Sequence, residues 1–195
     1  MNRNILTMVV ATAVSTGQLL AGDVLAQTYP AKPIRLVVGF SSGGTTDILA
    51  REIGARMQEN WGRSVLVEDR PGAGANIASE VGAKSPPDGY TLLVATNSIA
   101  INPAIYTRLP FDPVGDFAPI SFLGSVTNIL IAHPSLPAKS IKELIALAKA
   151  KPREVTYGSG GIGTAPHLSI ELFAALAKIE IVHVPYKGVA PVIQG

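Results

Sequence analysis

The chain contains no cysteine, carries little excess charge and has few aromatic side chains. Of its 195 residues, 16 are lysine or arginine and 14 are aspartate or glutamate, which gives a formal net charge of +2. The absence of cysteine excludes a disulfide framework and a thiolate metal site. The basic residues form no run, so the sequence shows no electrostatic footprint for nucleic acid. A hydrophobic share of 47% excludes a disordered chain and is typical of a globular protein.

The first 26 residues differ from the rest and predict a signal peptide. Arg3 supplies a positive start, residues 5–14 are almost wholly apolar, and Val24-Leu25-Ala26 resembles a cleavage site. The alternative is a membrane anchor, which needs about 20 consecutive apolar residues, more than this run contains. We therefore expect cleavage before Gln27 and export. A cysteine-free exported chain fits a bacterial periplasm.

The remaining chain alternates short β-branched runs with segments of helical apolar spacing. Such alternation predicts an α/β fold, in which parallel sheets carry helices on both faces. The predicted strands are residues 34–38, 65–67, 91–95, 155–157 and 181–184. The predicted helices are residues 46–60, 76–84, 140–151 and 164–178, and Ser140 with Glu143 forms a capping box.

Three polar or glycine-rich loops follow predicted strands, at residues 40–47, 96–98 and 158–164. Ligands of α/β sheets bind at the carboxyl ends of the strands, where such loops gather. Glycines allow close backbone approach, and a helix N-terminus attracts an anion without a charged side chain. The candidate ligand-binding residues are Phe40, Ser41, Ser42, Gly43, Gly44, Thr45, Thr46, Asp47, Thr96, Asn97, Ser98, Ser159, Gly160, Gly161, Thr164 and His167.

Two other chemistries have weaker support in the third loop. Gly158, Gly160 and Gly163 match the spacing of a dinucleotide-binding fingerprint, but this lone match in an exported chain is weak evidence. Ser159 and His167 could serve a secreted hydrolase, yet no clear third catalytic member follows. The three histidines lack metal-ligand spacing, and His183, inside a strand, is expected to be structural.

Several motifs, taken in order along the chain, resemble one known family. They are Tyr29-Pro30-Ala31-Lys32-Pro33, Gly43-Gly44-Thr45-Thr46-Asp47, Glu68-Asp69-Arg70-Pro71-Gly72-Ala73-Gly74, Pro87-Asp88-Gly89-Tyr90, Asn102-Pro103, Phe111-Asp112-Pro113, Asp116-Phe117-Ala118-Pro119, Tyr157-Gly158-Ser159 and His183-Val184-Pro185-Tyr186-Lys187-Gly188. The sequence looks like the Bug family of periplasmic solute-binding proteins, receptors of tripartite tricarboxylate transporters. One departure is Gly39-Phe40-Ser41-Ser42, where relatives more often have Pro-Phe-Pro-Ala, so the resemblance does not carry the ligand's identity.

The resemblance implies a periplasmic-binding-protein-like fold of type II, a Venus flytrap with two lobes. It places the first part of lobe one at residues 27–125 and an incomplete lobe two at residues 126–195. It implies a small carboxylate ligand (a di- or tricarboxylate, an acidic amino acid or an aromatic acid), with no cofactor, no metal and no enzymatic activity. The implied partners are the membrane subunits of a tripartite tricarboxylate-type transporter, and the full-length receptor is expected to be a monomer. A ligand-presenting sensor component is an alternative that the sequence does not separate from transport.

The chain is shorter than members of the family that it resembles. Members of the resembled family continue well beyond the last predicted strand, so we expect this chain to lack a C-terminal part. Such a chain would leave a sheet edge and apolar surface uncovered in lobe one. The apolar runs at residues 120–123 and 128–132 are expected to carry the chain from one lobe to the other.

Overall fold

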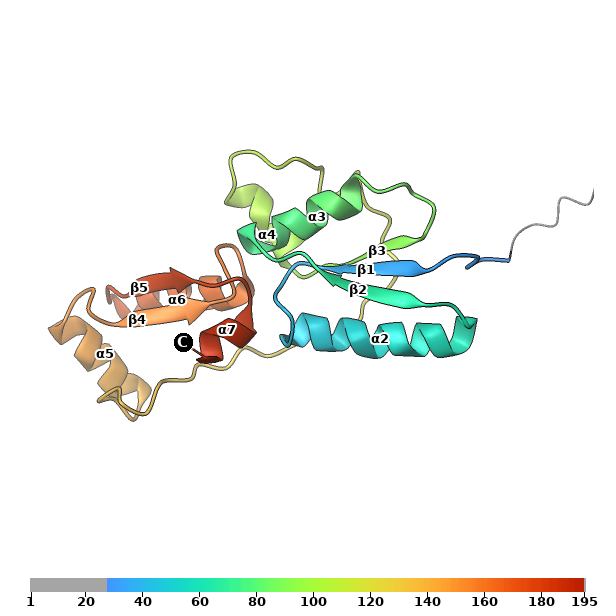
Figure 1. Cartoon of the computed structure of the whole chain (residues 1–195). Helices are drawn as coiled ribbons and strands as arrows, with labels where there is room; N and C mark the ends of the chain where they lie inside the picture. The colour runs from blue at the N-terminus through green and yellow to red at the C-terminus, as the bar shows by residue number, and fades with distance from the viewer. Residues whose placement is uncertain (1–27, 195) are drawn as a thin grey trace, which may run out of the picture. The chain divides into compact units, whose positions relative to one another are not determined.

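Two parallel sheets flanked by helices make up the part of the chain that the structure describes (Figure 1). The structure is a computed structural model that describes residues 28–194, and the predicted signal peptide at residues 1–26 lies outside them. The chain divides into two units, residues 1–31 and 32–195, and the description below concerns the second. Within the described residues, no helix has the length and apolar character needed to cross a membrane.

The first sheet has three parallel strands in the order β2-β1-β3. They are β1 (Ile34–Val38), β2 (Val65–Asp69) and β3 (Thr91–Val94). The central strand is covered on both sides, and its Val37 and Val38 are fully buried. This burial explains why β1 is a continuous run of aliphatic residues interrupted only by Arg35.

Helices cover both faces of this sheet. Helix α2 (Thr45–Trp61) packs on β1 and β2, and α3 (Asn76–Ala83) packs on β3 and β1. Figure 1 shows α2 and α3 on opposite sides of the strands. Ala50 of α2 is fully buried against Leu36 and Val38, and Gly62 ends α2 in the left-handed conformation. A short 3-10 turn, η2 (Ala73–Ala75), leads into α3.

The second sheet pairs β4 (Thr156–Ser159) with β5 (Val182–Pro185) in parallel. Its helices are α5 (Ile141–Ala150), α6 (Ala165–Ala177) and α7 (Val189–Gln194). The core beside it contains Ala148, Ala174 and Ile179. Ser140 caps α5 as predicted, because the Glu143 N–H donates to its Oγ at 3.3 Å. The return bond of the predicted capping box is displaced by one residue, since Glu143 Oε2 accepts from the Lys139 N–H at 2.7 Å.

Between the two sheets the chain forms short helical turns and then an extended segment. Helix α4 (Ser98–Ile101) and the 3-10 turn η3 (Asn102–Ala104) follow β3, and Phe111 packs edge-on against Phe117 at 5.8 Å. Residues 118–133 contain no helix or strand, and their large apolar side chains are exposed. This connection therefore carries a run of exposed apolar side chains. Its most exposed members are Ile120, Phe122, Val126, Ile129 and Ile131.

Candidate functional site

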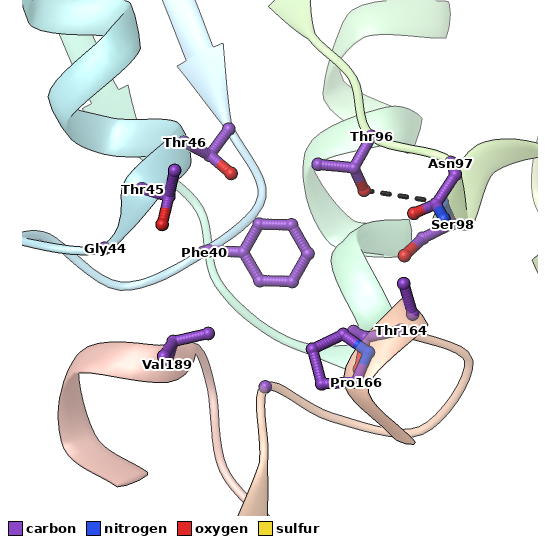
Figure 2. A pocket seen from close by; sticks show the side chains of 12 residues that line it. Phe40, Gly44, Thr45, Thr46, Thr96, Asn97, Ser98, Thr164, Pro166 and Val189 are labelled. Atoms are coloured by element: carbon purple, nitrogen blue, oxygen red, sulfur yellow. Dashed lines mark hydrogen bonds between the residues drawn. The ribbon is translucent and has the colours of Figure 1, made fainter. Parts of the chain in front are cut away.

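A pocket lies where the loops after β1, β3 and β4 meet the start of α7 (Figure 2). Its volume is about 110 Å³, far more than one water molecule needs, so it has room for a small molecule. Nine of the sixteen residues expected from the sequence line it: Phe40, Gly44, Thr45, Thr46, Thr96, Asn97, Ser98, Gly160 and Thr164. Ala165, Pro166 and Val189 complete the lining.

Two long helices begin at this pocket. Gly44 is the N-cap of α2 and Thr164 is the N-cap of α6, and both residues line the cavity. Neither N-cap makes a side-chain hydrogen bond to its own helix; the Thr164 hydroxyl donates to the Gly161 carbonyl at 2.7 Å instead. A helix N-terminus carries a partial positive charge and free N–H groups, so both ends favour a negatively charged group.

The pocket lining itself is neutral. None of the twelve residues that line it has an ionisable side chain. Figure 2 shows the threonine hydroxyls of α2 on one side, the residues 96–98 on another and the Phe40 ring among them. The site therefore combines hydroxyl and backbone donors with apolar surface, as small-molecule sites commonly do.

Ser98 is the most distinctive polar residue of the lining. It is only 1% exposed, and its Oγ has no hydrogen-bond partner among the described residues. Its backbone N–H donates to Thr96 Oγ1 at 3.4 Å, which holds this short turn together. A buried hydroxyl without a hydrogen-bond partner costs free energy, so a ligand that hydrogen-bonds to Ser98 Oγ would bind more tightly.

Asp47 braces the first loop from behind instead of lining the pocket. Its carboxylate accepts from the Gly43 N–H at 2.8 Å and from Ser42 Oγ at 3.2 Å, and it pairs with Arg51 Nε at 2.8 Å. Burial acts to raise the pKa of Asp47, but the hydrogen bonds from Arg51 and Gly43 outweigh it and lower that pKa. The ionised carboxylate thus fixes the turn that precedes α2.

Asp69, at the end of β2, lies beside this group. Burial and the nearby negative charge of Asp47 raise the pKa of Asp69 above its ordinary value. Arg51 contacts Asp69 as well, at 3.4 Å, and so neutralises part of the paired negative charge. Arg51 therefore links the two carboxylates, and it is not among the residues that line the pocket.

Ser41, at the start of the first loop, meets the chain after β5. Its backbone N–H donates to the Lys187 carbonyl at 2.9 Å. A Cβ at Gly188 would overlap Ser41, so this approach depends on a glycine. The contact brings the end of β5 to the loop after β1 and places Val189 at the pocket edge. A glycine before a helix is the only sequence signal that points to Val189.

Ser159 lies beneath the third loop and does not line the pocket. It is 2% exposed, and its Oγ accepts from the Gly161 N–H at 3.2 Å. The hydrolase alternative pairs Ser159 with His167, and the structure corrects this pairing: Ser159 Oγ lies 2.7 Å from His183 Nε2. His167 Nδ1 instead accepts from the Gly163 N–H at 3.4 Å. Burial and these contacts leave the Ser159 hydroxyl as part of the loop's support.

His183 is a hydrogen-bonded structural histidine, as its place in a strand predicts. Its ring stacks on Tyr157 at 4.8 Å and lies 4.4 Å from the ring of His167. Burial lowers the pKa of His183, and the neighbouring His167 lowers it further. Among the residues that the structure describes, no group of three or more histidine, aspartate or glutamate side chains could hold a metal ion.

The fold and the pocket together define an α/β protein of the periplasmic-binding-protein type. A solved periplasmic binding protein, BugD, matches with a TM-score of 0.76 at 31% identity, covering 85% of this chain and 56% of that one. The model of the tripartite tricarboxylate transporter family receptor matches residues 49–195. The chain belongs to this family, and the resemblance to the Bug proteins is confirmed.

Curated relatives agree with this assignment. Protein BugT of Bordetella pertussis is 37% identical over 195 residues, which cover 99% of this chain and 60% of the relative. A second relative, the UPF0065 protein in the gbd 5' region of Cupriavidus necator, is 36% identical over 178 residues, 91% of this chain and 54% of that protein. The chain thus spans between half and two thirds of the length of these relatives.

Two of the similar solved structures are complexes with a ligand. One is Rpa4515 of R. palustris with adipate, 41% identical with a TM-score of 0.76, and this chain covers 56% of it. The other is MatC from Rhodopseudomonas palustris with bound malate, 28% identical with a TM-score of 0.76, of which 57% is covered. In both comparisons 85% of this chain is matched.

Proposed function

We propose that the protein is a periplasmic receptor that captures a small carboxylate in the pocket described above. The observation that carries this proposal is that the N-termini of α2 and α6 both open at a pocket without ionisable side chains. Such an arrangement binds an anion through backbone N–H groups and helix dipoles. The predicted signal peptide supports location in the periplasm.

A dicarboxylate suits the site better than a monocarboxylate. The two helix N-termini are separate donor sets, so one carboxylate can face α2 while the other faces α6. Ser98 adds a buried hydroxyl that has no partner among the described residues, and Phe40 and Val189 offer apolar contact for a carbon chain. The relatives described with adipate and with malate both hold dicarboxylates, which supports the same ligand class here.

The two sheets favour a two-lobed organisation for binding. We assign residues 27–125 to the first part of one lobe and residues 126–195 to part of the second. The sheet β2-β1-β3 lies before this boundary and the sheet β4-β5 after it. A ligand that touches both lobes stabilises their closed arrangement. Membrane subunits of a tripartite tricarboxylate-type transporter would then recognise and bind the closed form.

The proposal is tested by a thermal-shift titration with malate and with adipate, each compared with its neutral diamide. A ligand that binds only the folded protein raises the melting temperature as its concentration exceeds the dissociation constant. We expect a saturable rise with a dicarboxylate and none with the diamides. Equal shifts with acid and diamide, or no shift with any member of a wider carboxylate panel, would contradict carboxylate capture.

Replacing Ser98 by alanine is expected to weaken dicarboxylate binding about threefold to tenfold, the value of one ordinary hydrogen bond. The folded protein should keep its stability, because Ser98 Oγ has no partner to lose among the described residues. Isothermal titration calorimetry on Ser98→Ala checks this, with Ser121→Ala as a control at an exposed serine. An unchanged affinity in Ser98→Ala would show that the hydroxyl does not face the ligand.

A further inference from the structure

Four side chains form a continuous cluster behind the third pocket loop. Tyr157 and His183 are paired across β4 and β5, and their rings stack. His167, in the first turn of α6, covers the other side of His183 at 4.4 Å. Glu171, one turn further along α6, accepts a short hydrogen bond from the Tyr157 hydroxyl. None of these side chains lines the pocket.

The cluster is joined to the pocket loop at two backbone N–H groups. His183 Nε2 bonds Ser159 Oγ at 2.7 Å, and the same oxygen accepts from the Gly161 N–H at 3.2 Å. His167 Nδ1 accepts directly from the Gly163 N–H at 3.4 Å. Gly161 and Gly163 both have positive φ angles, a backbone conformation that favours glycine. These hydrogen bonds give each of the two N–H groups a side-chain acceptor.

We propose that His183 and His167 are positioning residues that hold the loop of residues 160–164 in its ligand-binding arrangement while both rings are neutral, and that protonation releases this hold. The proposal rests on the proposed function in one respect: Gly160 and Thr164 of this loop line the ligand pocket. It extends that function by making ligand capture depend on pH.

The chemistry of the contacts explains the release. A protonated imidazole has two N–H donors and no acceptor, so a protonated His167 would face the Gly163 N–H with a second donor. The two adjacent histidine rings also repel each other when both are charged. Glu171 is the acidic group that opposes this repulsion, but its carboxylate is already bonded to the Tyr157 hydroxyl.

The direction of the pH effect follows from the environment of His183. Burial, and then the neighbouring His167, keep the pKa of His183 below its ordinary 6.5, while Glu171 acts weakly in the opposite direction. A histidine with a lowered pKa in the folded protein contributes its full stabilisation above its unfolded pKa. That stabilisation is lost progressively as the pH falls below about 6.5. The loop should therefore be held at neutral pH and loosened in acid.

The experiment is a nuclear magnetic resonance titration of the isotope-labelled protein from about pH 8 to about pH 5. It follows the three histidine rings and the backbone amides of Gly161 and Gly163. His133, in an exposed turn and bonded to Ser135, is the internal reference. We expect the pKa of His183 to lie below its ordinary 6.5, and both glycine amides to shift together with the ring signals of the cluster.

Variants separate the two arms of the cluster. His167→Gln should remove the pH response of Gly163, His183→Gln should remove that of Gly161, and His133→Gln should leave both unchanged. Glycine amides that do not respond to pH in the wild-type protein would overturn the proposal, and so would a response that persists in both cluster variants. If a variant fails to fold, the wild-type titration still tests the proposal, because it shows whether the Gly161 and Gly163 amides respond to pH.

Ligand binding gives the second readout. The dicarboxylate that gives the largest thermal shift is titrated at about pH 7.5 and about pH 5.5, and its affinity should fall severalfold at the lower pH. His183→Gln should reduce this dependence, and His133→Gln should keep it. Absence of binding at both pH values would contradict the proposed function. The amide titration would still test whether the two histidines hold the loop, because it needs no ligand.

Discussion

Replacing Gly163 by alanine is expected to destabilise the protein by about 2–5 kcal/mol, the sum of a left-handed backbone strain and an overpacked contact. Gly163 has a φ of 82°, and a Cβ there would overlap the Oδ1 atom of Asn102. Asn102 cannot easily move away, because it is 1% exposed and its amide donates to the Gly74 carbonyl at 2.9 Å and to Asn76 Oδ1 at 2.6 Å. Urea unfolding of Gly163→Ala and of the wild-type protein measures the difference.

A matched glycine separates the two causes. Gly62 has a φ of 62°, but nothing lies within 4 Å of the position a Cβ would take. Gly62→Ala should therefore cost only the backbone strain, about 1–2 kcal/mol. The double variant Gly163→Ala/Asn102→Ala should lose less free energy of unfolding than the two single variants lose together, because removing the Asn102 side chain removes the overlap. Equal losses at Gly62 and Gly163 would show that Asn102 does not restrict the loop.

The sequence predicts the regular elements well because each has a local cause. The run Ile34–Val38 forms β1 with the predicted bounds, since aliphatic residues fill a strand buried on both sides. Helix α2 extends the prediction of residues 46–60 by one residue at each end. Helix α4 is not predicted, because Thr96, Asn97 and Ser98 are typical of a loop and the helix is a single turn.

The site is predicted less completely than the fold, for a physical reason. Sequence spacing identifies which loops follow strands, but it does not determine which way each side chain faces. Asp47 lies in the predicted loop, yet its carboxylate turns back to the Gly43 N–H and away from the pocket. The partner of Ser159 depends on strand register: β4 and β5 place Tyr157 opposite His183 and so bring that ring to Ser159. His167 is nearer to Ser159 in sequence, but it bonds Gly163.

The pocket lining shows the same division between local and tertiary information. Gly44 and Thr164 can be identified from the sequence because glycine and threonine precede helices, where they commonly act as N-caps. Val189 is missed because only the approach of Gly188 to Ser41 brings α7 to the cavity. Contacts between loops that lie far apart in sequence are set by packing, and single-sequence patterns do not report them.

Replacing Asp47 by alanine is expected to lower the free energy of unfolding by about 3 kcal/mol, since hydrogen bonds to a charged group contribute about 1.5–3 kcal/mol each. The substitution leaves the Gly43 N–H without its acceptor and removes the buried partner of Arg51. Dicarboxylate affinity should fall as well, because the turn before Gly44 and Thr45 loses its brace. Glu59→Ala is the matched control on α2: its pair with Arg56 at 2.9 Å is exposed, and such pairs contribute little.

The pH dependence of the Asp47 contribution provides an independent check. Because the folded protein holds the pKa of Asp47 below its ordinary 3.8, the contribution is complete above that pH and is lost as the pH falls through the folded value. The difference in unfolding free energy between the wild-type protein and Asp47→Asn should therefore narrow below about pH 4. Asp47→Asn should also lower the pKa of Asp69, because it removes the adjacent negative charge that helps to raise it. A difference that stays constant from neutral to acid pH would mean that Asp47 acts through its shape and not through its charge.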